Sequence, residues 1–480
     1  MTTMARISHA VKLYNVVKSK GKGDKVARDF TTGNPTKQLT LFAMPIVVSM
    51  ILQNLYTVVD MIVVGQFVGD DALAAVGTTG SMSMLVLMLM QGATMGMSVV
   101  VSQFFGAKEE KMVKKAVVTS FYLIIALALI FGALGAVFSR QLLQLIRVPD
   151  NILGDATTYL RIIFMGSIAT AMYNMVAQIS RATGDSVTPM VMLIISSILH
   201  IGLDILLVGQ FHLSVSGVAY STIFSSLIAA AVCFIQTWRK MPLLHPTRET
   251  AKIDANVVKM VFKIGIPSAL QSSTLALGQI AVQTIVNGFG STVIAAYTAA
   301  TKIEALVSYP PGGFTGAMQV FAGQNVGANN FKRVRRGFKD TFIIILVYSV
   351  ISATVMAVFG RQLTSLFTST GGKMLDIGQE YLIMAAIGTV FCGLLQLTKS
   401  TLNGAGDAAA GVWVSVLELA GRILGAFILA RYVGYIGAFA GGPIGWLIGS
   451  IFGSIRYLSG SWTKKRLVVT DMPTDSQETA

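Results

Sequence analysis

Residues 116–138 read AVVTSFYLIIALALIFGALGAVF and contain no charged side chain. A helix of about twenty apolar residues is long enough to cross the roughly 30 Å hydrocarbon core of a bilayer. Hydropathy and polar loops mark eleven further stretches of this kind. The twelve candidate spans lie near residues 39–68, 74–102, 116–138, 157–180, 187–208, 215–238, 256–286, 292–324, 338–359, 378–402, 410–432 and 434–458. The sequence therefore predicts an all-α, polytopic membrane protein with twelve transmembrane helices.

The overall composition supports this fold class. The chain has 480 residues, of which 53% are hydrophobic and 12% are charged, whereas soluble proteins carry about twice that charged fraction. Both cysteines, Cys233 and Cys392, lie in apolar runs, so we expect no disulfide framework and no thiolate metal site. The nucleotide-binding pattern Gly-x-x-x-x-Gly-Lys-Ser/Thr is absent, which argues against ATP hydrolysis. Composition excludes a secreted or nucleic-acid-binding protein, and we expect neither enzymatic activity nor a cofactor or metal.

The net charge of +15 is unevenly distributed and indicates the orientation in the membrane. Cytoplasmic loops of membrane proteins collect Lys and Arg. An even number of spans places both termini on one side, and the strongly basic loops lie on that same side. They comprise Lys108–Lys115, Arg239–Lys263, Lys332–Lys339 and Lys464–Arg466, whereas the opposite loops contain Asp70, Asp71 and scattered basic residues. We therefore predict a plasma-membrane protein with both termini in the cytoplasm.

Loop positions also divide the chain into five parts. These are a basic N-terminal tail at 1–38, a six-helix lobe at 39–238, a linker at 239–255, a second six-helix lobe at 256–460 and a C-terminal tail at 461–480. The first tail lacks the apolar core and cleavage site of a signal peptide. Residues 7–20 fit either a short interfacial helix on anionic lipid or a flexible cytoplasmic tail.

The second half of the chain repeats the first at an offset of about 221 residues. The matches include Pro45 with Pro267, Gln103 with Gln324, Gly106-Ala107 with Gly327-Ala328, Arg140-Gln141-Leu142 with Arg361-Gln362-Leu363, and Gly184-Asp185 with Gly406-Asp407. Each repeat contains an even number of spans, so the two lobes share one orientation and are related by a pseudo-two-fold axis along the membrane normal. Rocking of two such lobes about a central cleft gives alternating access, which favours a secondary transporter over a channel or receptor.

Four acidic residues fall inside predicted spans: Asp60, Asp204, Glu304 and Glu418. Each costs about 2.5–3.5 kcal/mol near the bilayer centre, so a functional or paired role is expected. Asp60 has no basic neighbour in sequence. A lone carboxylate that binds a cation or takes up a proton is what ion-coupled transport requires; the alternative is a protonated acid in a polar network.

His200 precedes Asp204 by four residues, a helical spacing that places both side chains on one face. Imidazole changes charge near neutral pH, and a neighbouring carboxylate can fix its protonation state. The two side chains are therefore predicted to titrate as a unit. The alternative is that Asp204 is an interfacial charge at the outer end of its helix.

The charged residues of the second half have a more structural pattern. Glu418 and Arg422 share the i, i+4 spacing and are predicted to form a structural ion pair. Glu304 must find a partner elsewhere, and Lys399 is expected to reach the headgroups from a helix end. Pro310-Pro311 is predicted to interrupt its helix and to act as a hinge.

The stretch from Pro45 to Gly69 resembles the multidrug and toxic compound extrusion family, as do Gln324–Ala328 and the paired Gly-Asp turns. The similarity runs from about residue 39 to residue 460, and the absence of an acid between Gln271 and Ile285 suggests the subgroup named for DNA-damage-inducible relatives. The resemblance implies an antiporter that exports amphipathic organic cations in exchange for protons or sodium. We expect it to act as a monomer.

The resemblance also implies a cation site in the N-terminal lobe. Its members map onto Asp60, Asn174 with the adjoining Gln178, His200, Asp204 and Thr222. His200 stands where the family carries Asn, which weakens the inference to sodium and favours proton coupling. The carboxylate that other subgroups carry in the tenth helix falls near Cys392, so no cation site is expected in the C-terminal lobe.

Two alternatives remain open at this point. A flippase for lipid-linked saccharides would need a cavity lined by several Arg or Lys side chains to hold pyrophosphate, whereas the N-terminal lobe offers mostly acid. A membrane scaffold or receptor that transports nothing would not require a buried carboxylate in the first helix.

Overall fold

The computed structural model describes residues 28–68, 70–146, 148–211, 213–367 and 372–468. Within these ranges, the side chains of residues 56–62, 65, 66, 70, 71, 73, 81, 82, 84–87 and 89 lie outside the description.

The described residues form thirteen α-helices and no strand, or twelve helical segments if the bent pair α5–α6 is taken as one, which confirms the all-α fold class. The first half contains α2 (Pro35–Phe67), α3 (Asp70–Gly106), α4 (Glu110–Leu145), the pair α5 (Asp150–Met165) and α6 (Ser167–Ala182), α7 (Val187–Asp204) with the π-helical turn η1 (Ile205–Gln210), and α8 (Ser214–Lys240). The second half contains the short η2 (Pro242–Leu244), α9 (Ala255–Asn287), α10 (Ser291–Gly327), α11 (Phe331–Ser365), α12 (Lys373–Ala405), α13 (Ala408–Val433), α14 (Tyr435–Leu458) and η3 (Ser461–Lys465).

Most of these helices are long and apolar enough to cross a membrane. Among the described residues, eight helices meet this requirement by length and composition, and the bent pair α5–α6 makes a ninth. Helices α9 and α10 are less apolar, and they pack against each other and against α3 between the two halves. Helix α3 is not counted because many of its side chains lie outside the description. Helix α10 is buried without a break from Ala317 to Gly327. A helix that faces protein instead of lipid can carry glycine, glutamine and asparagine, which lowers its hydropathy.

Two predictions about helix continuity were wrong. The single span predicted near 157–180 is broken at Gly166 into α5 and α6, with an angle of 45° between them. Conversely, α10 is continuous through Pro310 and Pro311, where an interruption was expected. Pro311 cannot donate to the carbonyl of Val307, and the Tyr348 hydroxyl donates to that oxygen instead, at 3.0 Å. A side chain from α11 thus satisfies the carbonyl that the proline leaves free.

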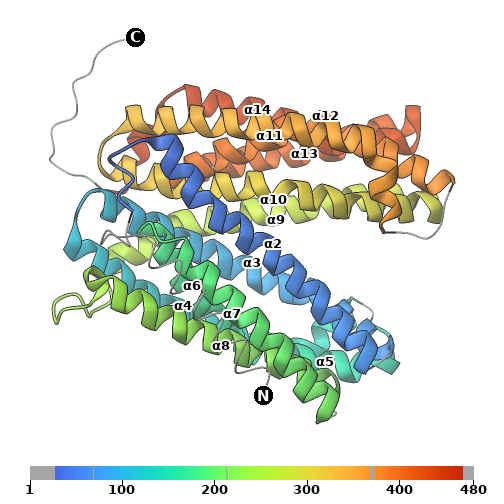
Figure 1. The fold of residues 1–480 in the computed structure, drawn as a ribbon, viewed down its shortest axis with the longest axis horizontal. Helices are drawn as coiled ribbons and strands as arrows, with labels where there is room; N and C mark the ends of the chain where they lie inside the picture. The colour runs from blue at the N-terminus through green and yellow to red at the C-terminus, as the bar shows by residue number, and fades with distance from the viewer. Residues whose placement is uncertain (1–27, 69, 147, 212, 368–371, 469–480) are drawn as a thin grey trace.

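The two halves of the chain form two groups of helices (Figure 1). Helices α9–α14 occupy the upper part of this view, α3–α8 lie below them, and α2 runs diagonally across both. We call the end of the bundle where α2 begins and α14 ends the terminal end; it lies at the left of Figure 1. The halves meet where α3 packs on α9 and α10, and where α2 packs on α10.

Glycine allows the closest approach between α3 and α9. A Cβ atom at Gly96 would lie 2.3 Å from the backbone oxygen of Val261, and one at Gly92 would lie 2.6 Å from Cβ of Ala269. Neither helix can yield locally, because the obstructing atoms belong to backbone or to a short, rigid side chain. These glycines set the distance between the two halves.

We expect Gly96→Ala to destabilise the protein by about 1–3 kcal/mol, because the added methyl group overpacks a backbone contact. The measurement is thermal unfolding in detergent. Gly80→Ala is the matched control on the same helix, because a Cβ atom there meets nothing within 4 Å. Equal stability of both variants would show that α3 and α9 do not approach at Gly96 as described.

Candidate functional site

A cluster of polar side chains lies buried in the first half, between α7 and α8. His200 Nδ1 lies 3.1 Å from Asp204 Oδ2. The other ring nitrogen, Nε2, lies 3.1 Å from the Thr222 hydroxyl and 3.3 Å from the Ser221 hydroxyl. Ser221 also donates a hydrogen bond to Asp204 Oδ1. The structure therefore joins a carboxylate, an imidazole and two hydroxyls in one connected set, which we call the N-half cluster.

The surrounding helices fix the geometry of the N-half cluster. His200 and Asp204 lie one turn apart on α7, and the π-helical turn η1 begins directly after Asp204. Single π-helical turns are frequent at functional sites. The hydroxyl oxygens of Ser221 and Thr222 also lie 2.8 Å and 3.0 Å from the carbonyl oxygen of Val218. The single proton of Ser221 is therefore shared between Val218 and Asp204. These bonds hold both hydroxyls against their own helix and aim them at α7.

The N-half cluster is deeply buried, which bears on the two interpretations of Asp204. The side chains of His200 and Asp204 are 1% and 0% exposed. An interfacial charge would be accessible at the surface, so this burial favours the interpretation that the two side chains act as a unit. A buried imidazole–carboxylate pair can gain or lose one proton while its hydrogen-bond partners stay in place.

The other residues predicted for this site lie on neighbouring helices. Asn174 and Gln178 occupy successive turns of α6 and are half-buried, but no described hydrogen bond links their side chains to the N-half cluster. Asp60 lies on α2, which packs against α7 and η1; its side chain is outside the described part of the structure. Sequence reasoning missed Ser221, although the adjacent hydroxyls at 221 and 222 in an apolar helix were a usable signal.

A second set of buried charges lies in the other half. Arg422 Nη2 lies 3.1 Å from Glu418 Oε1, the contact expected from their spacing. Lys399 Nζ lies 3.5 Å from the second oxygen, Glu418 Oε2. The expectation that Lys399 reaches the headgroups was therefore wrong, because α12 and α13 bring its ammonium group to a buried carboxylate. One anion thus holds two cations, and we call these three residues the C-half triad.

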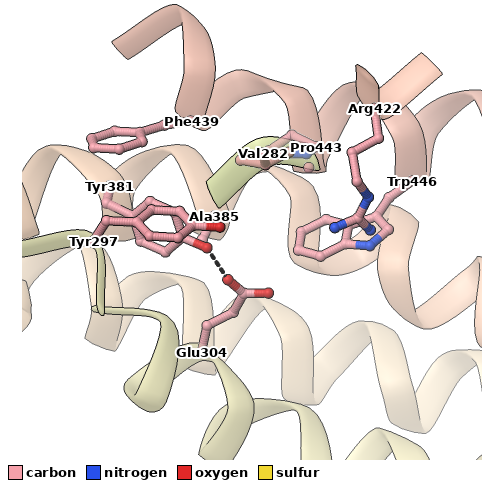
Figure 2. A pocket seen from close by; sticks show the side chains of 10 residues that line it. Val282, Tyr297, Glu304, Tyr381, Ala385, Arg422, Phe439, Pro443 and Trp446 are labelled. Atoms are coloured by element: carbon pink, nitrogen blue, oxygen red, sulfur yellow. Dashed lines mark hydrogen bonds between the residues drawn. The ribbon is translucent and has the colours of Figure 1, made fainter. Parts of the chain in front are cut away.

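A small cavity next to the C-half triad contains the fourth acid, Glu304 (Figure 2). The Tyr381 hydroxyl donates to its carboxylate. Tyr297, Phe439 and Trp446 line the rest of the cavity, and the Arg422 guanidinium lies over the Trp446 ring at 5.5 Å from the centroid. The cavity measures about 20 Å³, which admits about one water molecule. It is therefore too small for an amphipathic drug.

In the part of the chain that the structure describes, no group of three or more His, Cys, Asp or Glu side chains is arranged to hold a metal ion. Cys233 and Cys392 are free thiols in separate halves.

The C-half triad gives a stability prediction. Glu418→Gln should destabilise the protein by about 3–5 kcal/mol, because Lys399 and Arg422 then lie buried without an anion. Arg422→Gln should be milder, because Lys399 still neutralises Glu418, and the Glu418→Gln/Arg422→Gln double variant should also be milder than Glu418→Gln alone. Thermal unfolding in detergent measures these differences.

The control is Arg361→Gln, since Arg361 pairs with Asp376 at an exposed site and such pairs contribute about 0–1 kcal/mol. Losses of the same size in Glu418→Gln, Arg422→Gln and the double variant would show that the three charges do not act together.

Comparisons of this chain with known proteins agree on one family. The family model MatE matches the chain twice, at residues 45–206 and 267–428, and these two regions are the halves of the internal duplication. The probable multidrug resistance proteins YoeA and YpnP of Bacillus subtilis are 27% and 29% identical to this chain. The YoeA alignment covers 90% of this chain and 95% of the relative; the YpnP alignment covers 92% and 99%. The multidrug export protein MepA of Staphylococcus aureus is 24% identical, over 75% of this chain and 81% of its own length.

Solved structures show the same fold. A crystal structure of a MATE protein in the bent conformation superposes with a TM-score of 0.85 at 21% identity, covering 91% of this chain and 98% of the other. An outward-facing MATE transporter of the MOP superfamily gives a TM-score of 0.84 at 22% identity, over 92% and 99% of the two chains. These proteins have the two-lobe, twelve-span architecture predicted here. Because the family model matches both halves of the chain and more than half of its residues, this protein belongs to the MatE, or multidrug and toxic compound extrusion, family and is a membrane transporter, not an enzyme.

Proposed function

We propose that this transporter is a secondary active multidrug antiporter of the plasma membrane, which exports amphipathic organic cations in exchange for protons. The observation that carries the proposal is the N-half cluster, a buried imidazole–carboxylate pair with two hydroxyl partners inside a membrane transporter. The relatives named multidrug resistance and multidrug export proteins support the substrate class. The sequence lacks the Gly-x-x-x-x-Gly-Lys-Ser/Thr pattern of ATP-hydrolysing proteins, and we propose an ion gradient as the driving force.

Protons are favoured over sodium by the chemistry of the N-half cluster. A sodium site is built from several oxygen ligands, whereas His200 supplies nitrogen on the side facing Asp204. Proton uptake needs only groups that exchange a proton near the working pH, and imidazole is the side chain that does so. We propose that Asp60, with Asn174 and Gln178 nearby in the fold, completes the same site. Sodium coupling is the alternative, and transport assays with and without sodium distinguish it from proton coupling.

The charge of the described site favours cationic substrates over lipid-linked pyrophosphates. The N-half cluster contains a carboxylate and no Lys or Arg. In the other half, Lys399 and Arg422 are held by Glu418 and are not free to bind phosphate. A flippase for lipid-linked saccharides is therefore the weaker candidate. A membrane scaffold that transports nothing would not explain why the titratable pair His200 and Asp204 is buried inside the protein.

The contacts between the two halves support rocking between inward and outward states. Among the described residues, hydrogen bonds between the halves gather toward the terminal end; the one deepest in the bundle joins Asn54 Nδ2 to the Tyr309 hydroxyl at 2.6 Å. The basic loops place the terminal end in the cytoplasm. This conformation is thus closed toward the cytoplasm. We propose Pro310-Pro311 as the hinge in α10, because a single Tyr348 hydroxyl replaces a backbone hydrogen bond there.

The first transport prediction concerns Asp60. Asp60→Asn should abolish coupled efflux while leaving membrane insertion intact, because an amide fills the same space but cannot carry a cycling charge. The measurement is ethidium efflux driven by a proton gradient in everted vesicles. Asp155→Asn, a change at an exposed acid, is the control and should transport normally. Efflux at the wild-type rate in Asp60→Asn, at equal expression, would refute its role.

The second transport prediction concerns the pH dependence. His200→Asn should shift the pH profile of efflux without abolishing transport, because the amide keeps the hydrogen bonds but removes one titrating group. Efflux is measured in proteoliposomes, with and without sodium, between about pH 5.5 and 8, a range that brackets the ordinary imidazole pKa of about 6.5.

His245→Asn is the matched control for this experiment, because His245 lies in the linker after η2 and stacks on Trp238. Its pH profile should match that of the wild type. An unchanged profile in His200→Asn, or efflux that requires sodium at every pH, would contradict proton coupling through His200.

A further inference from the structure

Two equivalent glutamines close the seam between the halves at the terminal end. Gln103 near the end of α3 donates from Nε2 to the carbonyl of Gly404 at 2.9 Å. Gln324 near the end of α10 donates from Nε2 to the carbonyl of Ala182, also at 2.9 Å. Each glutamine thus reaches from its own half to the other. Both side chains are 0% exposed, so the crossing bonds are sealed from water.

The helix ends at this seam touch backbone to backbone. A Cβ atom at Gly106 would lie 1.9 Å from the Gln324 carbonyl oxygen, and one at Gly327 would lie 2.0 Å from the Gln103 carbonyl oxygen. The duplication explains this symmetry, since Gly106 and Gly327 are matched positions. Only glycine permits such a close approach. Opening of the seam therefore requires α3 and α10 to separate.

Each glutamine also holds a segment from one end of the chain. The side-chain oxygen of Gln324, Oε1, accepts from the backbone N–H of Phe30 at 2.9 Å. That of Gln103 accepts from the backbone N–H of Leu467 at 2.8 Å. We call residues 28–33 the N-terminal strap and residues 465–467 the C-terminal strap. One amide side chain therefore ties together both halves and one strap.

The N-terminal strap is anchored by more than this one bond. The Phe30 ring is 0% exposed and packs edge-on against Phe42, with ring centroids 4.9 Å apart. Its carbonyl accepts from Asn325 Nδ2 at 3.1 Å and from Arg333 Nε at 2.7 Å. Arg333 also donates to the carbonyls of Thr32 and Gly33. The strap is thus docked on α10 and α11 of the second half.

Both straps also cover the paired Gly-Asp turns. Gly184 and Gly406 have φ angles of +91° and +94°, a conformation that favours glycine. A Cβ atom at Gly184 would lie 2.4 Å from the Arg28 carbonyl oxygen, and one at Gly406 would lie 2.6 Å from the Lys465 carbonyl oxygen. The N-terminal strap therefore touches the first half through Gly184 while it is docked on the second.

We propose that the two straps are latches that hold this transporter closed toward the cytoplasm, with Gln103 and Gln324 as the residues that fasten them. The proposal rests on the proposed alternating access. Opening the terminal end separates α3 from α10, which breaks both crossing bonds and frees the strap amides that the same glutamines bind. Because the seam and the straps share these two side chains, they open together as a two-state element. Weakening either strap shifts the population toward the cytoplasm-open state.

The test measures opening directly with one cysteine at the seam. Val99 is 1% exposed and packs with Ile264 and Ala408 across the two halves. Val99→Cys is introduced after Cys233 and Cys392 are replaced by alanine, and its labelling by a membrane-impermeant maleimide is followed in lipid nanodiscs. The thiol is protected while the seam is closed and reacts when the seam opens.

Gln103→Met, Gln324→Met and Phe30→Ala should each raise the labelling rate at least about fivefold, the lower end of ordinary conformational coupling. Gln283→Met is the matched control, since Gln283 is a half-buried glutamine that bonds only within α9 in the described structure, and it should label as slowly as the parent. If a glutamine variant fails to fold, Phe30→Leu and Arg333→Lys carry the test, because they weaken the docking of the N-terminal strap and leave both glutamines unchanged. In these two variants, labelling should also rise.

Unchanged labelling in the folded variants would overturn the latch. Faster labelling in the two glutamine variants with no change in Phe30→Ala, Phe30→Leu or Arg333→Lys would also overturn it, because the seam would then hold without the straps. Ethidium efflux by the parent protein in the same lipid distinguishes this result from failure of the antiport proposal. If labelling rises in every strap variant but the parent protein exports no ethidium, the latch proposal stands and the antiport proposal is rejected.

Discussion

A carboxylate inside a bilayer must be paired, protonated or bound to a cation, and this constraint separates the roles of the two halves of the chain. In the second half, Glu418 meets it with two fixed cations, Lys399 and Arg422. In the first half, Asp204 meets it with the neutral hydroxyl of Ser221 and with the His200 imidazole, whose charge state is adjustable. Glu418 is therefore held by two fixed cations, whereas the partner of Asp204 is itself titratable.

This division fits a duplicated protein whose halves have diverged in function but not in scaffold. The glutamines at 103 and 324, the glycines beside them and the Gly-Asp turns keep matched positions and matched contacts. The buried acids do not: Asp204 has no counterpart in the C-half triad. Symmetry is thus kept at the contacts between the halves, and it is lost among the buried acids.

Much of the fold could be predicted from the sequence, because the length of apolar stretches indicates the membrane spans and the basic loops indicate their orientation. Contacts at i, i+4 spacing, such as His200 with Asp204, could also be predicted, because both residues lie on one helix and the helix sets their separation. Features that depend on a second element could not. The bend at Gly166, the Tyr348 hydroxyl that keeps α10 continuous and the reach of Lys399 to Glu418 all require the packing of neighbouring helices. The straps could not be predicted either, because no pattern in their sequence indicates which helices they bind.

Proton movement during drug transport tests the central claim most directly. Proteoliposomes without sodium are loaded with a pH-sensitive dye and given an outward gradient of ethidium but no pH gradient. Antiport through the N-half cluster predicts that protons enter as ethidium leaves, so that the lumen acidifies in proportion to the drug exported. Ethidium efflux without any change in luminal pH, or efflux that begins only when sodium is added outside, would contradict the account.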